Sequence, residues 1–397
     1  MSNRFEHDSV ISGIGQSAVG RRLGRSDLDL TTQACLAAIA DAGLERSDID
    51  GLSTYPGGYS ATTAGYGGPA PYEVQDALRL ELNWHQGAAE LPGQLGALIA
   101  ACTAVSAGLA RHVLVYRTVT ESAAQGDRGR GSVLPSGPGT ASGMGRWLLP
   151  FGGVSAVNWL AQVATRHFHE FGTTREQLGA IPTTVRAHAA LTPKAVFRNP
   201  LSMADYLASR MISTPLCLFD CDVPVDGSTA LVVSAAQYAP DVPHGAVRID
   251  AVGTALHGRP SWDQYADLTS MAAQGAARHL WSRTDLRPAD VDVAQLYDGF
   301  SILALAWLEA LGFCGRGEGG PFVEGGERIA LTGQIPLNTG GGQLSGGRLH
   351  GFGLLHEAIV QLRGQGGERQ VAGAEVAVVG NGGGPIAGAV LLTTDRG

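Results

Sequence analysis

The segment LTTQACLAAIADAGLERSDIDGLSTY at residues 30–55 returns in modified form at residues 268–297, as LTSMAAQGAARHLWSRTDLRPADVDVAQLY. Four positions of the first copy match four of the second at a constant offset: Leu44, Asp48, Asp50 and Tyr55 correspond to Leu286, Asp290, Asp292 and Tyr297. Each copy has the pattern of an alanine-rich helix, a short acidic turn and a strand. The repeat predicts a chain made of two similar halves.

The segments that follow each copy are also similar. A second helix pattern and a buried strand pattern occupy residues 92–110 and 112–119 in the first half, and residues 350–364 and 375–384 in the second. A further strand pattern ends each half, STALVVSAA from Ser228 and IAGAVLLTT from Ile386. Short apolar strands that alternate with helices of ten or more residues indicate α/β layers. We therefore expect a duplicated α/β fold with a functional site where the halves meet.

A long insertion, roughly residues 121–219, interrupts the first half. Its first part, GDRGRGSVLPSGPGTASGMG, is rich in Gly, Ser and Pro and predicts a mobile loop, whereas SAVNWLAQVATRHFHEFG and TREQLGAIPTTVRAHAALT predict two helices. An insertion of this length indicates a lid or substrate-shaping subdomain, with a dimerisation arm as the alternative. The expected boundaries are 1–120 and 220–244 for the first half, 121–219 for the insertion and 245–397 for the second half.

The composition excludes several classes of protein. With 44% apolar and 16% charged residues, the chain can bury a large core and is not disordered. A net charge of -8 without a run of basic residues argues against a nucleic-acid partner. No apolar stretch reaches about 18 residues and the N-terminus has no apolar signal core, so we expect a cytoplasmic protein without a membrane span. Five scattered cysteines give no zinc pattern, so no metal site is expected.

Several motifs resemble those of the thiolase superfamily over nearly the whole chain: the duplicated halves, YDGFS from Tyr297, LNTGGGQLSGGRLHGFG from Leu337 and GNGGGPIAGAVLL from Gly380. Within it, LYDGFSILALAWLEALGFCGRGEGGPFV from Leu296 is similar to the lipid-transfer-protein branch, which includes the sterol side-chain aldolases of actinobacteria. The resemblance implies a duplicated thiolase fold, layered α-β-α-β-α, with pseudo-twofold halves and an inserted loop subdomain. It also implies a homodimer through the thiolase core and a small OB-fold partner that helps to hold the acyl-CoA.

Three positions depart from the thiolase pattern. Where a thiolase has its nucleophilic cysteine, its second-half histidine and its terminal cysteine, this chain has Leu91, Arg348 and Asn381. Cys102 lies eleven positions after Leu91, inside a predicted helix, so we expect its thiol to pack in the core. The resemblance therefore excludes acyl-cysteine chemistry, and the similar aldolases also lack the cysteine.

Those aldolases are thought to use two tyrosines, and the first corresponds to Tyr297 at the end of a predicted buried strand. The second position is Arg348. A phenol with a pKa near 10 is a poor base at neutral pH, but a nearby cation lowers its pKa. Because a cation is disfavoured ahead of a helix, we expect Arg348 to face an anion, which would be a phenolate, an enolate or a CoA phosphate. An outward ion pair with a surface carboxylate is the alternative.

Four further residues are candidates for the site. His350 could relay a proton or donate to the thioester oxygen, or else bind a neighbouring carbonyl in a structural role. Asp298 could orient Tyr297 or His350, with turn capping as the alternative. The amides of Gly383 and Gly384 could form an oxyanion hole, or merely a tight hairpin turn. The glycine-rich stretch from Leu337 lacks a phosphate-loop ending, so we expect it to let loops converge on one pocket.

The residues and the resemblance together predict an aldolase, a carbon–carbon lyase that cleaves a β-hydroxyacyl-CoA thioester by a retro-aldol reaction in sterol or lipid side-chain degradation. This reaction needs a base for the β-hydroxyl proton and a cradle for the enolate. We expect no cofactor, because CoA is part of the substrate. Two alternatives stay open: cysteine-independent acyl transfer or decarboxylation on an acyl-CoA, and a non-catalytic subunit that binds acyl-CoA or lipid.

Overall fold

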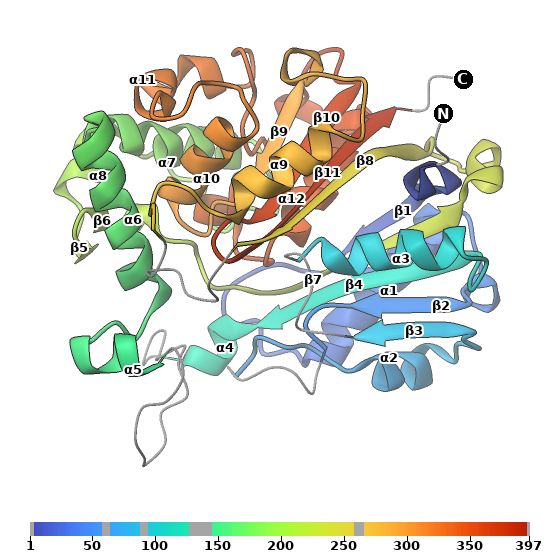
Figure 1. The fold of residues 1–397 in the computed structure, drawn as a ribbon. Coiled ribbons are helices and arrows are strands. Elements are labelled where there is room, and N and C mark those ends of the chain that lie inside the picture. The colour runs from blue at the N-terminus through green and yellow to red at the C-terminus, as the bar shows by residue number, and fades with distance from the viewer. Residues whose placement is uncertain (1–3, 58–63, 88–93, 127–144, 258–265, 395–397) are drawn as a thin grey trace.

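The computed structural model describes residues 4–57, 64–87, 94–126, 145–257 and 266–394. Its largest sheet has the strand order β3-β2-β4-β7-β1-β8-β11-β10-β9 (Figure 1). The strands are β1 Ser9–Gln16, β2 Gly51–Thr54, β3 Trp84–Gly87, β4 His112–Thr120, β7 Asp226–Ala235, β8 Val247–Leu256, β9 Val293–Leu296, β10 Val376–Gly382 and β11 Ile386–Thr394. From the β1–β8 junction, the order β1-β7-β4-β2 in the first half corresponds to β8-β11-β10-β9 in the second, and β3 is an additional edge strand of the first half. This order confirms the predicted duplication.

The two halves share one continuous sheet, which the sequence did not predict. At the junction β1 and β8 are antiparallel, and only Val10 and Ile11 pair across it, with Arg248 and Val247. The interior strands of both halves are buried and apolar. The predicted closing strands of both halves are confirmed as β7 and β11.

Helices complete five layers. They are α1 Asp27–Asp41, α2 Pro71–Leu78, α3 Gly96–Ser106, α4 Glu121–Gln125, α5 Gly145–Leu148, α6 Ala156–Phe171, α7 Arg175–Ala190, α8 Met203–Ala208, α9 Ala272–Trp281, α10 Ser301–Ala310, α11 Gly319–Val323 and α12 Phe352–Leu362. The repeated helices α1 and α9 cover the outer faces, on β1 and β8. Helices α3 and α12 form the middle layer, and α12 contacts strands of both halves. The predicted α-β-α-β-α layering is confirmed (Figure 1).

Glycines in the two junction strands let the outer helices approach closely. A Cβ on Gly13 or Gly15 of β1 would lie 2.2 Å from a carbonyl oxygen of α1. The same holds in the second half, where a Cβ on Gly253 of β8 would lie 2.1 Å from the carbonyl oxygen of Ala276 in α9. Any side chain there would push the helix off the sheet. The repeat is therefore a repeat of packing as well as of sequence.

The repeated aspartates explain why each half begins its inner strand at the same place. Asp50 Oδ1 accepts the N–H groups of Arg111 and His112, at the start of β4. Asp292 Oδ2 accepts those of Glu375 and Val376, at the start of β10. Each carboxylate thus fixes one strand against its parallel neighbour. The tyrosine five residues later leaves the sheet at an equivalent position in both halves.

The insertion lies beside both halves (green, left in Figure 1) and carries α4 to α8 with the hairpin of β5 Met211–Ser213 and β6 Leu216–Cys217. Its two predicted helices are confirmed as α6 and α7. Helix α7 packs against α10 and α11 of the second half. Most of the Gly/Ser/Pro-rich segment falls outside the described residues. Among the described helices, none has the length and apolarity needed to cross a bilayer.

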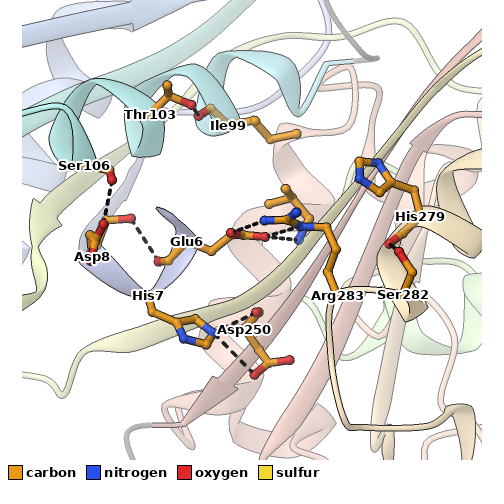
Figure 2. Close-up of polar contacts among 12 residues, drawn as sticks. Glu6, His7, Asp8, Ile99, Thr103, Ser106, Asp250, His279, Ser282 and Arg283 are labelled. Atoms are coloured by element: carbon orange, nitrogen blue, oxygen red, sulfur yellow. Dashed lines mark hydrogen bonds and ion pairs between the residues drawn. The ribbon is translucent and has the colours of Figure 1, made fainter. Parts of the chain in front are cut away.

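A short turn near the N-terminus, η1 Phe5–Asp8, fastens the halves together (Figure 2). The buried Glu6 carboxylate accepts two hydrogen bonds from Arg283, which follows α9, at 2.7 and 2.6 Å. Asp8 accepts a hydrogen bond from Ser106 of α3 at 2.6 Å. The pKa of Glu6 is lowered, because the Arg283 bonds and backbone donors outweigh burial, which alone would raise it.

Candidate active site

Equivalent tyrosines from the two halves meet at one histidine. Tyr55 follows β2 and Tyr297 follows β9. The Tyr55 ring stacks on the His350 imidazole, with ring centroids 5.8 Å apart and an interplanar angle of 16°. The Tyr297 ring meets the same imidazole edge-on at 6.2 Å. The structure therefore brings the predicted residues Tyr297 and His350 together and adds Tyr55, which the repeat had already paired with Tyr297.

Glycine-rich backbone holds His350 in an unusual conformation. Its φ is +53°, and that of the following Gly351 is +86°. A Cβ on Gly351 would lie 2.3 Å from Nδ2 of Asn381, so only glycine fits there. Gln343 Oε1 accepts the Gly351 N–H at 3.1 Å, which ties the glycine-rich segment to the turn. The turn carries His350 to the N-terminus of α12.

Two polar side chains reach Nε2 of His350 from the first half. The Tyr66 hydroxyl lies 3.0 Å from it, with its ring edge-on to the imidazole at 4.7 Å. The side-chain amide of Gln94 lies 3.3 Å from the same nitrogen. Gln94 precedes α3 as His350 precedes α12, so the N-termini of the two middle helices meet here. Sequence reasoning missed both residues, because neither lies in a recognisable motif.

A buried arginine completes the cluster. Arg117 of β4 is fully buried, and its Nη2 lies 3.3 Å from Nδ1 of His350. Its guanidinium carbon lies 4.9 Å from the ring centre of Tyr66 and 5.9 Å from that of Tyr55. Its Nε has no hydrogen-bond partner within the described parts of the chain. Burial lowers the pKa of Arg117, against the opposing effect of Tyr66 and Tyr55. The signal for it was an arginine inside the apolar strand pattern HVLVYRTV.

Arg348 is buried, and it does not point to a surface carboxylate as one alternative held. Its guanidinium forms ion pairs with Glu121 of α4 and with Asp222, whose Oδ2 lies 3.3 Å from Nε. Burial lowers the pKa of Arg348, but the two carboxylates outweigh it and raise the pKa. With both carboxylates ionised the trio has a net charge of -1. The anions that Arg348 faces are therefore protein carboxylates. Of the two buried arginines at the site, Arg117 is the one that has no carboxylate partner among the described residues.

Asp298 contributes to the site indirectly, by holding the backbone turn that leads to His350. Its buried Oδ1 accepts the N–H of Gln343 at 2.8 Å, at the start of the turn η10 Gly342–Gly346. A Cβ on Gly342 would overlap the Asp298 carboxylate. Burial raises the pKa of Asp298 to about 7, although the Gln343 N–H and other donors oppose this shift. Asp298 therefore caps a turn, and it connects to His350 through Gln343 and Gly351.

The terminal glycines form the turn between β10 and β11. The Gly383 N–H donates to the carbonyl of Ile386 at 3.1 Å, and the Gly383 and Gly384 carbonyls accept the N–H groups of Ala273 and Ala272 at the start of α9. The Gly383 amide is thus engaged inside the hairpin, which corrects its expected role in an oxyanion hole. For Gly384 the role stays a prediction.

Comparison with known proteins identifies the family. The model for the thiolase C-terminal domain-like family matches residues 254–394. A steroid side-chain-cleaving aldolase of Thermomonospora curvata is 36% identical over 402 residues, covering 98% of both proteins. The chain belongs to the thiolase superfamily, in the branch of these aldolases. A 17-hydroxy-3-oxo-4-pregnene-20-carboxyl-CoA lyase of Mycobacterium tuberculosis is 34% identical, covering 96% of this chain and 98% of that protein. A solved Ltp2-ChsH2(DUF35) aldolase is 33% identical with a TM-score of 0.87, over 98% of this chain and 99% of that chain.

The properties of the Cys102 thiol agree with membership of the aldolase branch. Cys102 lies buried in the middle of α3, and burial raises the pKa of its thiol to about 12. A thiol with that pKa is not a nucleophile at neutral pH. Leu91, which stands where a thiolase has its cysteine, lies outside the described residues.

Proposed function

We propose that this thiolase-superfamily protein is a carbon–carbon lyase that cleaves a β-hydroxyacyl-CoA thioester by a retro-aldol reaction. The observation that carries the proposal is the convergence of Tyr55, Tyr66 and Tyr297 on His350, with Arg117 beside them, in a chain without a thiolase cysteine at position 91. Phenols and an imidazole can move protons but cannot form an acyl-thioester intermediate. The site is therefore suited to proton transfer and to the stabilisation of an enolate.

In this mechanism Tyr297 reacts as the phenolate and takes the proton of the β-hydroxyl group. The C–C bond between the carbinol carbon and the α-carbon then breaks, and the released electron pair becomes the thioester enolate. Because two carboxylates neutralise its charge, we assign Arg348 the role of positioning Tyr297 through its fixed ion pairs. A buried guanidinium held by two carboxylates is fixed in position, and it therefore restricts where the phenol can lie.

Positive potential at the cluster would stabilise the enolate oxygen. The N-termini of α3 and α12 both lie here, since Gln94 and His350 contact each other directly ahead of them. A helix N-terminus is equivalent to roughly half a positive charge. The guanidinium of Arg117 adds to this inside a buried environment, where preorganised charge has a large effect on a developing anion.

The relatives suggest the substrate and the partner. The Thermomonospora curvata protein is named for cleavage of steroid side chains, and the Mycobacterium tuberculosis protein for a pregnene carboxyl-CoA. We extend this to a steroid side-chain acyl-CoA here. The solved aldolase carries a DUF35 component in its name, which supports a second protein chain as partner. We propose that a small acyl-CoA-binding protein serves in this way, and that the thiolase core forms a homodimer.

The test is product analysis by mass spectrometry. A tertiary β-hydroxyacyl-CoA with a steroid side chain is incubated with the protein, with and without a DUF35 partner. We expect a ketone and a short acyl-CoA, and we expect Tyr297→Phe to lower kcat by about 100-fold or more, the size of a lost general base. Tyr238→Phe is the matched control, because Tyr238 contacts His112 at 4.6 Å outside the site. Unchanged substrate under both conditions would exclude the lyase.

A further inference from the structure

We propose that Tyr66 is the general acid of the reaction, delivering a proton to the α-carbon of the thioester enolate, with His350 and Arg117 as positioning residues that control the Tyr66 hydroxyl. This inference rests on the proposed retro-aldol function and adds its second proton-transfer group. Tyr66 is not one of the residues that the sequence motifs single out.

The reaction needs such an acid. Cleavage leaves an enolate, and the short acyl-CoA forms only when its α-carbon receives a proton. Arg348 does not supply it, because a guanidinium with buried carboxylate partners does not release a proton. Another group in the cluster must therefore supply it.

The hydrogen bonds of His350 assign its tautomer. A guanidinium can only donate, so the contact between Arg117 Nη2 and Nδ1 at 3.3 Å requires an unprotonated Nδ1. The proton of the neutral ring then lies on Nε2, which faces the Tyr66 hydroxyl at 3.0 Å. The side-chain amide of Gln94 lies at the same nitrogen, so it must present its oxygen there, and this orientation also gives a partner to an amide oxygen that otherwise has none among the described residues. With Nε2–H donating to the Tyr66 oxygen, the hydrogen of that hydroxyl is directed away from His350.

The surroundings of Tyr66 favour an acid over a base. Burial is the largest influence and raises its pKa well above 10, with Tyr55 and Tyr297 adding to the shift and Arg117 opposing it. Tyr66 is therefore protonated at neutral pH. When it gives up its proton, the Nε2–H of His350 and the charge of Arg117 stabilise the phenolate that forms.

The protons taken up and released in the reaction balance when Tyr297 enters it as the phenolate. Tyr297 gains the proton of the β-hydroxyl group, and the C–C electron pair becomes the enolate. The O–H bond of Tyr66 breaks as a C–H bond forms at the α-carbon. His350 lies between the two phenols, with ring centroids 4.7 Å from Tyr66 and 6.2 Å from Tyr297. The resting state returns when Tyr297 releases its proton to water and Tyr66 takes a proton from water.

The experiment follows the α-carbon directly. The protein is incubated in D2O with a short acyl-CoA product, and deuterium uptake at the α-carbon is measured by mass spectrometry. This exchange reverses only the step assigned to Tyr66, and it needs no cleavage. We expect Tyr66→Phe to lower exchange by about 100-fold, and Tyr297→Phe to retain it. If Tyr66 only supports the fold, a Tyr66→Phe variant that is folded would keep the exchange, as Tyr297→Phe does.

Tyr116→Phe is the matched control, since Tyr116 is also a buried tyrosine whose hydroxyl holds the same segment, through the carbonyl of Pro69 at 2.8 Å. Wild-type exchange that persists in Tyr66→Phe overturns the inference, and so does wild-type protein that cleaves substrate without any exchange. Tyr66-dependent exchange without cleavage supports the acid and excludes the proposed function. Thermal unfolding of each variant shows that it is folded.

Discussion

At the scale of single residues, the site is a set of charges that cancel within the protein. Arg348 is matched by Glu121 and Asp222, and Arg117 contributes the further positive charge. The whole group is therefore neutral when both carboxylates are ionised. A buried guanidinium without carboxylates is costly, and a buried carboxylate pair without Arg348 would be costly too. The two ion pairs stabilise the buried Arg348 side chain beside Tyr297, while Arg117 interacts with the phenol rings and with His350.

Asp298 gives a pH-dependent prediction at this scale. Its pKa rises from an ordinary value of 3.8 to about 7 on folding, so between these values the folded state binds the proton and the unfolded state does not. Stability contributed by the protonated carboxyl is present below about pH 4 and is lost as the pH rises to about 7. The stability of wild type relative to Asp298→Asn should fall over that range, on the order of 3 kcal/mol.

Urea unfolding of both proteins at pH 4, 5, 6 and 7 measures this difference. Asp285→Asn is the control, since Asp285 is exposed in the loop after α9 and should show no such trend. A constant difference between wild type and Asp298→Asn at all four pH values would contradict the prediction.

Sequence patterns could reach only part of this site. The YDGFS motif and the His-Gly turn gave Tyr297 and His350, and the repeat links Tyr55 to Tyr297. Glu121 lies 227 positions before Arg348, and no local pattern predicts that pairing. Tyr66 lies in an irregular segment whose path depends on tertiary contacts. Arg117 stands in a strand whose apolar pattern conceals a functional side chain.

At the scale of elements, both halves use the same capping interaction between an aspartate and the start of a strand. Asp50 and Asp292 each accept two backbone N–H groups at the start of an inner strand. The predicted strands and helices that carry the repeat are confirmed, and the short strands β2 and β9 are buried at every position. Strand β3 was not predicted, because Trp84–Gly87 is short, alternates between exposed and half-buried positions and is held only by pairing with β2 at the sheet edge.

The capping aspartates give the prediction at this scale. Asp292→Ala leaves the N–H groups of Glu375 and Val376 without their acceptor, so we expect a loss of about 2 kcal/mol in the free energy of unfolding. Denaturant unfolding at neutral pH measures it, with Asp285→Ala as the surface control, expected within about 0.5 kcal/mol of wild type. Because β10 leads to the terminal glycines, the variant should also weaken acyl-CoA turnover. A loss no larger than that of the control would contradict the structural role.

At the scale of the whole molecule, connections between the halves hold them in register so that the two tyrosines meet. The β1–β8 junction has only two residue pairs. Helix α12 packs in a core shared by both halves, with Phe352 and Leu355 among the buried residues. The turn η1 adds polar contacts across the interface (Figure 2). The sequence predicted the meeting of the halves, but not these connections, because they depend on how the halves are packed.

The Glu6–Arg283 pair gives the prediction that tests this connection. Arg283→Gln leaves a fully buried carboxylate without its cation, so we expect a loss of about 3 kcal/mol at neutral pH. In wild type the folded-state pKa of Glu6 is lowered, so its contribution is present above the unfolded pKa near 4.5 and is lost as the pH falls through the lower folded value. In the variant, burial favours the protonated acid. The stability difference should therefore shrink as the pH falls from 7 toward 3.

Arg287→Gln, an exposed arginine four residues on, is the matched control. An equal loss at pH 3 and pH 7 would show that Arg283 stabilises the interface by packing, without the charge of Glu6.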